Sequence, residues 1–195
     1  MNRKGSTDRR TRETSISVQV DLDGAGRSTI ETGIGFFEHM LELLVRNAGL
    51  DANIVADGDL QVDEHHTVED VGLVLGSALS EALGDRRGIR RYGFYVPMDE
   101  ALARVVLDLG GRPFVVFEAA FTRERVGELP TELVEDFVRG LAQTLGANIH
   151  VRVEYGRNDH HRIEAIFKAL GRALRAAIER DSRFEDRIPS TKGIL

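Results

Sequence analysis

Two segments of the chain carry hydrophobic residues at every third or fourth position, which is the spacing of the buried face of an amphipathic helix. Asp63 and Asn158 lie just before these segments, and both residue types favour the N-cap of a helix. We therefore predict two helices, each with a pair of histidines in its first turn. The apolar positions are Val68, Val71, Leu75, Ala78 and Leu79 in the first helix and Ile163, Ile166, Phe167, Leu170 and Leu174 in the second.

Strand patterns occur in both halves of the chain. Residues 15–20 alternate between polar and apolar side chains, and residues 114–117 form a β-branched and aromatic run after Pro113. Both patterns predict β-strands. The glycine-rich turns at residues 24–26 and 110–111 precede strands rather than helices, so we interpret them as hairpin turns and not as phosphate-binding loops. A dinucleotide-binding fold is thereby excluded.

The chain contains an internal repeat. Residues 63–69 (DEHHTVE) align with residues 158–164 (NDHHRIE) at a shift of 95, and Gly76 then aligns with Gly171. Upstream, Glu38 and His39 align with Glu135 and Asp136 at a shift of 97. Residues 22–27 align with residues 107–112 at a shift of 85, so we expect an insertion near residues 123–130 of the second half.

The repeat predicts an α+β fold that is internally duplicated. Each half is expected to have β-β-α-β-α order, with its sheet backed by helices. We place the first half at residues 1–96, with a flexible N-terminal arm at residues 1–12. The second half covers residues 97–195 and ends in a C-terminal tail at residues 186–195.

Composition narrows the possible chemistry. The chain has no cysteine, so any metal site must be built from His, Asp and Glu. The net charge of -6 provides no basic surface for nucleic acid. Neither a membrane span nor a hydrophobic leader is recognisable, so we expect a cytoplasmic protein that binds neither nucleic acid nor membranes.

The repeated His-His-x-x-Glu motif predicts two metal sites. On a helix the first histidine and the glutamate share a face, whereas the second histidine points away from them. His66 and His161 can then complete the sites of the opposite motifs, either within one molecule or between neighbours, and the helix residues His39 and Asp136 can add a further ligand each. The predicted ligand sets are His39, His66, His160 and Glu164 for one ion and His65, Glu69, Asp136 and His161 for the other.

Five ordered segments give the chain a close resemblance to the imidazoleglycerol-phosphate dehydratase family. They are residues 32–41 (TGIGFFEHML), 63–70 (DEHHTVED), 108–113 (DLGGRP), 156–164 (GRNDHHRIE) and 189–193 (PSTKG). The resemblance implies a duplicated fold of the ribosomal S5 domain 2-like kind and a homo-oligomer of 24 subunits with active sites at subunit contacts. It also implies two Mn²⁺ ions in each active site.

The family reaction removes water from D-erythro-imidazoleglycerol 3-phosphate and yields imidazole acetol phosphate in histidine biosynthesis. Two metal ions on the two ring nitrogens would hold the substrate as an imidazolate, which explains why a dehydratase needs a duplicated site. The resemblance implies that Glu13 contacts the substrate and moves a proton, with Glu69 and Glu164 as competing carboxylates. It assigns Arg91, Arg112, Lys168, Ser190, Thr191 and Lys192 to the phosphate and the rest of the substrate.

One position departs from the family pattern, because the family usually has a second histidine where this chain has Asp136. Aspartate still binds hard cations, but its shorter reach and added charge alter the site. Two rival functions remain open from the residues alone. These are a dinuclear metal-dependent phosphoester hydrolase and a metal-linked assembly protein without catalysis.

Overall fold

The alternating segment at residues 15–20 belongs to a sheet built from the first part of the chain. A computed structural model describes residues 3–93, 96–182 and 186–195. In this first sheet the strand order is β1-β2-β4-β3, with β3 parallel to β4 and the other neighbours antiparallel. Its strands are β1 (Lys4–Arg10), β2 (Thr14–Asp21), β3 (Ser28–Glu31) and β4 (Asp51–Gly58).

A second sheet repeats this arrangement with the order β5-β7-β11-β8, and β6 also pairs with β7. Again the last pair is parallel and the others are antiparallel. Its strands are β5 (Tyr92–Gly93), β6 (Val96–Met98), β7 (Ala101–Asp108), β8 (Phe114–Glu118) and β11 (Asn148–Tyr155). The expected insertion forms a small hairpin of β9 (Arg125–Val126) and β10 (Leu129–Pro130).

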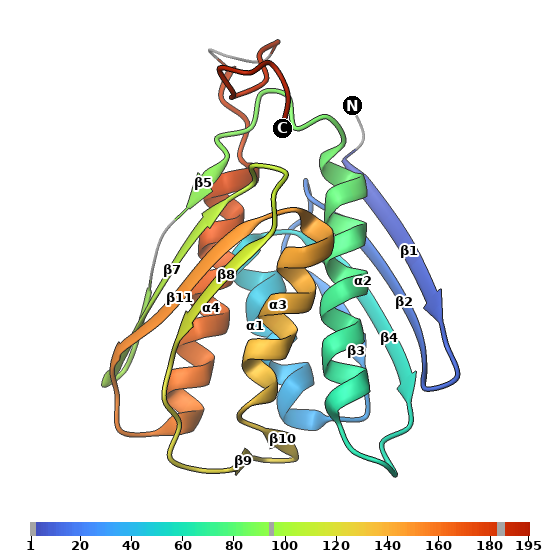
Figure 1. Ribbon diagram of the computed structural model, residues 1–195, viewed down its shortest axis with the longest axis vertical. Coiled ribbons are helices and arrows are strands. Elements are labelled where there is room, and N and C mark those ends of the chain that lie inside the picture. Colours follow the sequence, from blue (N-terminus) through green and yellow to red (C-terminus); the bar gives the residue numbers. More distant parts are fainter. Residues whose placement is uncertain (1–2, 94–95, 183–185) are drawn as a thin grey trace.

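The helices lie between the two sheets (Figure 1). They are α1 (Gly35–Ala48), α2 (His65–Leu83), α3 (Leu133–Leu145) and α4 (Asp159–Ile178). The predicted apolar stripes of α2 and α4 are buried, which confirms both helices and the direction of their hydrophobic faces. The predicted α+β class with repeated halves is therefore confirmed.

Helices of different halves pack against each other, α2 on α3 and α4 on α1. The repeated glycines make this approach possible. A Cβ atom at Gly76 would lie 2.5 Å from the carbonyl oxygen of Leu141, and one at Gly171 would lie 2.5 Å from that of Leu44. Real side chains do not tolerate such contacts, so glycine at both positions lets the helix backbones meet.

Strand pairing refines the repeat. Asp21 pairs with Asp51 in the first sheet, and Asp108 pairs with Asn148 in the second. Asp51 and Asn148 each begin a strand that directly follows the first helix of its half. Asp21 is therefore equivalent to Asp108, a shift of 108 − 21 = 87 rather than the 85 expected from the sequence. The sequence alignment followed the similar residues around the two turns and was therefore wrong by two positions in these strands.

The structure differs from the predicted borders at two places. Residues 4–10 of the expected N-terminal arm form β1, an edge strand paired along its length with β2. Strand β5 already pairs with β7, so Tyr92 and Gly93 belong to the second sheet although they precede the predicted border at 96/97. No helix in the described parts of the chain is long and apolar enough to cross a membrane.

Candidate active site

The helices α1, α2, α3 and α4 begin at the same end of the molecule, which is the lower end in Figure 1. Local hydrogen bonds fix the start of the two motif helices. The side chain of Asp63 accepts a hydrogen bond from the backbone N–H of His65 (2.9 Å), and Asn158 does the same for His160 (2.9 Å). Asn158 is therefore the N-cap of α4 as predicted, whereas the N-cap of α2 is Glu64 and Asp63 lies one residue before it.

His39, His160 and Glu164 form a first group of ligand atoms, which we call the α1–α4 cluster. One ligand atom from each residue lies within 4.8 Å of the other two. Nε2 of His160 is 3.3 Å from Oε2 of Glu164, one helical turn further along. Two imidazoles and one carboxylate at this spacing suit a divalent transition-metal ion.

Glu164 is a buried carboxylate with a cationic neighbour. Its Oε1 atom is 2.6 Å from Nζ of Lys168. Burial by itself raises the pKa of Glu164, but the hydrogen bond from Lys168 and the nearby charges of Lys168, His160 and His39 outweigh burial and lower the pKa below its ordinary value. Glu164 is therefore ionised at neutral pH and is suited to binding a cation.

His65, Glu69 and Asp136 form the equivalent group between α2 and α3, which we call the α2–α3 cluster. Nε2 of His65 lies 3.7 Å from Glu69, and Nδ1 of the same ring lies 3.9 Å from Asp136. The two carboxylates thus approach opposite nitrogens of one imidazole, so these ligands converge less closely than those of the α1–α4 cluster. The predicted ligand sets are each represented by three members in one chain.

The fourth predicted member of each set, His66 or His161, interacts with different residues. Nδ1 of His66 is 3.1 Å from Asp59, and its Nε2 is 3.9 Å from Glu13. Nδ1 of His161 is 2.7 Å from Glu100. The hydrogen bonds with Asp59 and Glu100 raise the pKa of His66 and His161, and the bond to His161 lowers the pKa of Glu100 to about 2.

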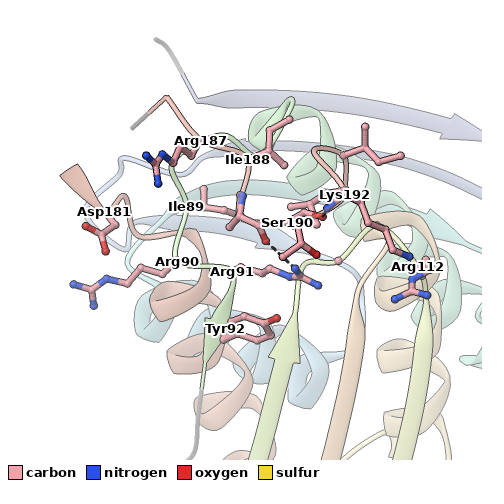
Figure 2. A pocket seen from close by; sticks show the side chains of 16 residues that line it. Ile89, Arg90, Arg91, Tyr92, Arg112, Asp181, Arg187, Ile188, Ser190 and Lys192 are labelled. Carbon is pink, nitrogen blue, oxygen red and sulfur yellow. Dashed lines mark hydrogen bonds between the residues drawn. The ribbon is translucent and has the colours of Figure 1, made fainter. Parts of the chain in front are cut away.

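The predicted phosphate residues gather elsewhere, around the C-terminal tail. A cavity of about 1150 Å³, here called the tail cavity, is lined by Arg91, Arg112, Ser190, Thr191 and Lys192 among others. Figure 2 shows Arg91 below the Ser190 segment, with Arg112 and Lys192 lining the same cavity. The arginine-rich run at residues 86–91 would by itself suggest an exposed basic loop.

Arg91 is instead held by a carboxylate and by the tail. Its guanidinium is paired with Asp108, and Nη1 donates a hydrogen bond to the carbonyl oxygen of Pro189 at 2.8 Å. The side chain is only 15% exposed. This pairing connects β5, β7 and the tail, and it keeps a cation at the base of the tail cavity.

The tail cavity and the two clusters lie at opposite ends of the molecule. In Figure 1 the C-terminal tail is at the upper end, whereas the helices that carry the clusters begin at the lower end. Lys168 lies with Glu164 in α4, and Glu13 lies next to His66, so neither joins the tail cavity. The residues assigned to the substrate are thus divided among separate parts of the molecule.

Sequence reasoning missed several carboxylates that support the site. Glu100 is 61 residues from His161, and Asp59 lies seven residues before His66 but outside the helix, so helical spacing reveals neither contact. Asp70 is buried and accepts a hydrogen bond from Oγ1 of Thr14 at 2.6 Å while pairing with Arg9. Helical spacing does not reveal these contacts, because Arg9 lies on β1 and Thr14 on β2.

Curated relatives match this chain over nearly its whole length. A chain from Clostridium botulinum (strain Okra / Type B1), named imidazoleglycerol-phosphate dehydratase, is 56% identical over 188 residues, which cover 96% of this chain and 95% of the relative. A Cereibacter sphaeroides (strain KD131 / KCTC 12085) chain of the same name is 54% identical over 194 residues, covering 99% of this chain and all of the relative.

Solved structures show the same likeness. The crystal structure of imidazoleglycerol-phosphate dehydratase from Staphylococcus aureus matches with a TM-score of 0.82 and 41% identity over 91% of this chain and 99% of that chain. The Pyrococcus furiosus enzyme matches with a TM-score of 0.84 and 36% identity over 97% of this chain and 100% of that chain. The family model for imidazoleglycerol-phosphate dehydratase matches residues 32–174. The chain therefore belongs to the imidazoleglycerol-phosphate dehydratase family.

Proposed function

We propose that this chain catalyses the dehydration of D-erythro-imidazoleglycerol 3-phosphate to imidazole acetol phosphate, a carbon–oxygen lyase reaction of histidine biosynthesis. Family membership supports the reaction. The observation that carries the chemistry is the pair of related clusters, one between α1 and α4 and one between α2 and α3. A planar imidazole ring with two nitrogens is a substrate that two related cation sites can hold at once.

Each active site is proposed to take two divalent transition-metal ions, because the donor set consists of imidazoles and carboxylates without sulfur. The family resemblance implies that these ions are Mn²⁺. His39, His160 and Glu164 would bind one ion, and His65, Glu69 and Asp136 would bind the other. When bound, the ions supply Lewis acidity at the two ring nitrogens of the substrate. His161 and His66 would complete these ligand sets, as the repeat predicts.

Proton transfer is proposed for Glu13. Its side chain is 54% exposed and faces Nε2 of His66, so it can reach a substrate held beside that ring. Glu69 and Glu164 are competing carboxylates for this step, but both belong to the clusters, and Glu164 is also paired with Lys168. A carboxylate outside the clusters is better placed to exchange a proton with the carbon framework.

Binding of the phosphate is proposed for the tail cavity. Arg91, Arg112 and Lys192 supply positive charge, and Ser190 and Thr191 supply hydroxyl donors. Lys168, beside Glu164, is expected to contact the substrate nearer the cluster. Since the tail cavity lies at the end opposite the clusters, one substrate would be held by residues of different chains.

The proposal therefore includes a homo-oligomer of 24 subunits with active sites at subunit contacts. Each cluster holds three of its four predicted ligands, and the fourth hydrogen-bonds a carboxylate outside both clusters, which supports assembly of the sites from several copies. A cytoplasmic location is part of the same proposal, because a phosphorylated intermediate of amino-acid biosynthesis is formed and consumed there.

The test combines a steady-state assay with measurement of molecular mass. Purified protein, stripped of metal and supplied with imidazoleglycerol phosphate, is expected to form the acetol phosphate only after Mn²⁺ is added. His66→Ala and His160→Ala are each expected to lose activity and to loosen the oligomer. His150→Ala is the matched control, because His150 lies on β11 beside Phe114 and outside both clusters.

Two results would contradict the proposal. Release of inorganic phosphate without the acetol phosphate would favour a dinuclear hydrolase. Assembly that depends on metal, combined with no binding of the substrate, would favour a structural role for the clusters.

A further inference from the structure

His66 and His161 occupy equivalent positions in the repeat, yet their carboxylate partners come from different places in the two halves. His66 uses Asp59, in the loop at residues 59–64 between β4 and α2. His161 uses Glu100, which directly precedes β7. In both cases the contact is to Nδ1, so Nε2 remains for another ligand.

Strand register identifies the counterpart of Glu100 in the first half. Because Asp21 of β2 is equivalent to Asp108 of β7, and both strands run for eight residues up to these positions, Thr14 corresponds to Ala101. The residues directly before these strands are Glu13 and Glu100. The same chain position thus carries a glutamate next to a motif histidine in each half.

The two equivalent glutamates approach opposite edges of their imidazoles. Glu100 is 2.7 Å from Nδ1 of His161 and also accepts hydrogen bonds from the backbone N–H groups of Arg157 and Asn158. Glu13 lies 3.9 Å from Nε2 of His66. Within the described parts of the chain, the Glu13 carboxylate accepts no hydrogen bond, and it is twice as exposed as that of Glu100 (54% against 27%).

The loops before the motif helices explain this difference. In the first half the loop at residues 59–64 supplies Asp59, whose side chain is only 17% exposed beside His66. Its backbone N–H also donates to the carbonyl oxygen of Glu13 at 3.0 Å. The corresponding loop of the second half is shorter, at residues 156–158, and its sequence Gly-Arg-Asn contains no carboxylate.

We propose that Asp59 is a positioning residue that takes over the Nδ1 contact of His66 and thereby leaves Glu13 free at the Nε2 edge, where the reaction takes place. The repeated halves then contribute unequally. The first half supplies a metal ligand and a free carboxylate, whereas the second half supplies a metal ligand whose glutamate is fully engaged. This inference rests on the proposed metal-dependent dehydration.

The physical reason is the need to orient a ligating imidazole. A histidine that binds a metal through one nitrogen is held in the correct tautomer and orientation when the other nitrogen donates to a carboxylate. Loss of such a partner typically lowers metal affinity or activity about 10- to 100-fold. A carboxylate used in this way is not available to move a proton.

The experiment compares the repeat-equivalent variants Glu13→Gln and Glu100→Gln with Asp59→Ala and Asp59→Asn in the intact oligomer. Mn²⁺ affinity is measured without substrate, from the electron paramagnetic resonance signal of free Mn²⁺. Asp59→Ala and Glu100→Gln are expected to weaken one class of sites about 10- to 100-fold, with partial recovery in Asp59→Asn. Glu13→Gln is expected to bind Mn²⁺ like the unmodified chain.

Turnover at saturating Mn²⁺ separates the roles further. The rate of Asp59→Asn and Glu100→Gln is expected to recover substantially as Mn²⁺ is raised, whereas Glu13→Gln loses about 10²- to 10⁴-fold at every Mn²⁺ concentration. The inference is overturned if Glu13→Gln and Glu100→Gln share one phenotype or if Asp59→Ala leaves Mn²⁺ affinity unchanged. If the unmodified chain binds no Mn²⁺, the proposed metal chemistry fails instead, which is a distinguishable result.

Discussion

Asp136 is the residue at which the two clusters differ in chemistry, because His39 occupies the corresponding position in α1. Replacing Asp136 with Asn removes the charge near Nδ1 of His65 while preserving the size of the side chain. We predict that Asp136→Asn weakens Mn²⁺ binding at one class of sites by about ten-fold or more, as measured by metal titration. The other class of sites should keep its affinity, since it uses His39, His160 and Glu164.

Glu135→Gln is the matched control for this prediction. Glu135 is the neighbour of Asp136 in the chain, but its carboxylate is 2.8 Å from Nε of Arg139, one turn along α3, and outside the cluster. Its removal should not change metal affinity. An equal effect of both substitutions would mean that general surface charge, and not ligation by Asp136, controls binding.

Asp51 gives a prediction about pH away from the clusters. A hydrogen bond from the side chain of Arg27, and others from the backbone N–H groups of Arg27 and Ala25, lower the pKa of Asp51 below its ordinary value. A carboxylate with a lowered folded-state pKa stabilises the fold above its unfolded pKa of about 3.9, and this contribution is lost as the pH falls. The urea midpoint of Asp51→Asn should therefore approach that of the unmodified chain as the pH is lowered from 6 to about 3.

Arg27→Gln provides the comparison, because it removes the guanidinium but retains both backbone donors to Asp51. It should show a smaller loss at pH 6 than Asp51→Asn. A constant difference between Asp51→Asn and the unmodified chain across this pH range would contradict the assigned role.

Residue-level chemistry was predictable from the sequence where the interacting groups are neighbours on one helix. The pairs His65 with Glu69 and His160 with Glu164 follow from helical spacing alone. The contact between His161 and Glu100 joins residues that are 61 positions apart, and no periodicity links them. Such contacts depend on where strands and loops end, which only the folded chain determines.

Elements with a buried, periodic face or a β-branched run were predicted, whereas the polar edge strand β1 and the shortest strands were not. The sequence of β1, KGSTDRR, is largely polar, because an edge strand exposes many of its side chains and needs little hydrophobic pattern. Short strands such as β5 and β9 carry too few residues to show alternation. The stripes of α2 and α4 were clear because both helices bury a face against a sheet and against another helix.

The contact between α4 and α1 predicts a coupling between helix packing and metal binding. In Gly171→Ala the new methyl group would overlap the backbone of α1 near Leu44 and force the helices apart. Overpacking of this kind costs about 1–3 kcal/mol of unfolding free energy, which urea denaturation would measure. The same separation should weaken Mn²⁺ binding, because His39 lies on α1 and Glu164 on α4.

Gly35→Ala is a suitable control for the packing argument. Among the residues that the structure describes, a Cβ atom at Gly35 would meet only the carboxylate of Glu128, at 3.9 Å, so α1 has room for it. Because alanine is the better helix former, this variant should be unchanged or stabilised by up to about 1 kcal/mol. If Gly171→Ala behaved in the same way, glycine at this position would not be required for the close approach of α4 and α1.

At the scale of the whole molecule, the separation of the clusters from the tail cavity has a direct consequence for assembly (Figure 1). The sequence indicated metal ligands and phosphate contacts but did not show that these two groups of residues lie at opposite ends of the folded molecule. That arrangement arises because the helices begin at one end, whereas the tail follows the end of α4 at the other. A substrate that needs both sets of residues must therefore take them from different copies of the chain.

Mixed oligomers test this consequence. Chains carrying Glu164→Gln and chains carrying Lys192→Ala, each inactive alone, are co-expressed with different affinity tags, and the mixed oligomers are purified. If every site draws Glu164 and Lys192 from two different chains, random mixing of equal amounts leaves about a quarter of the sites intact, and activity should return to about that level. Mixing Glu164→Gln with His160→Gln is the matched control, since both changes affect the α1–α4 cluster of a single chain. Every such cluster then contains one defect, so no activity should return. If neither mixture regains activity, Glu164 and Lys192 of one site come from the same chain. The start of α4 and the C-terminal tail lie at opposite ends of the molecule, which argues against that outcome.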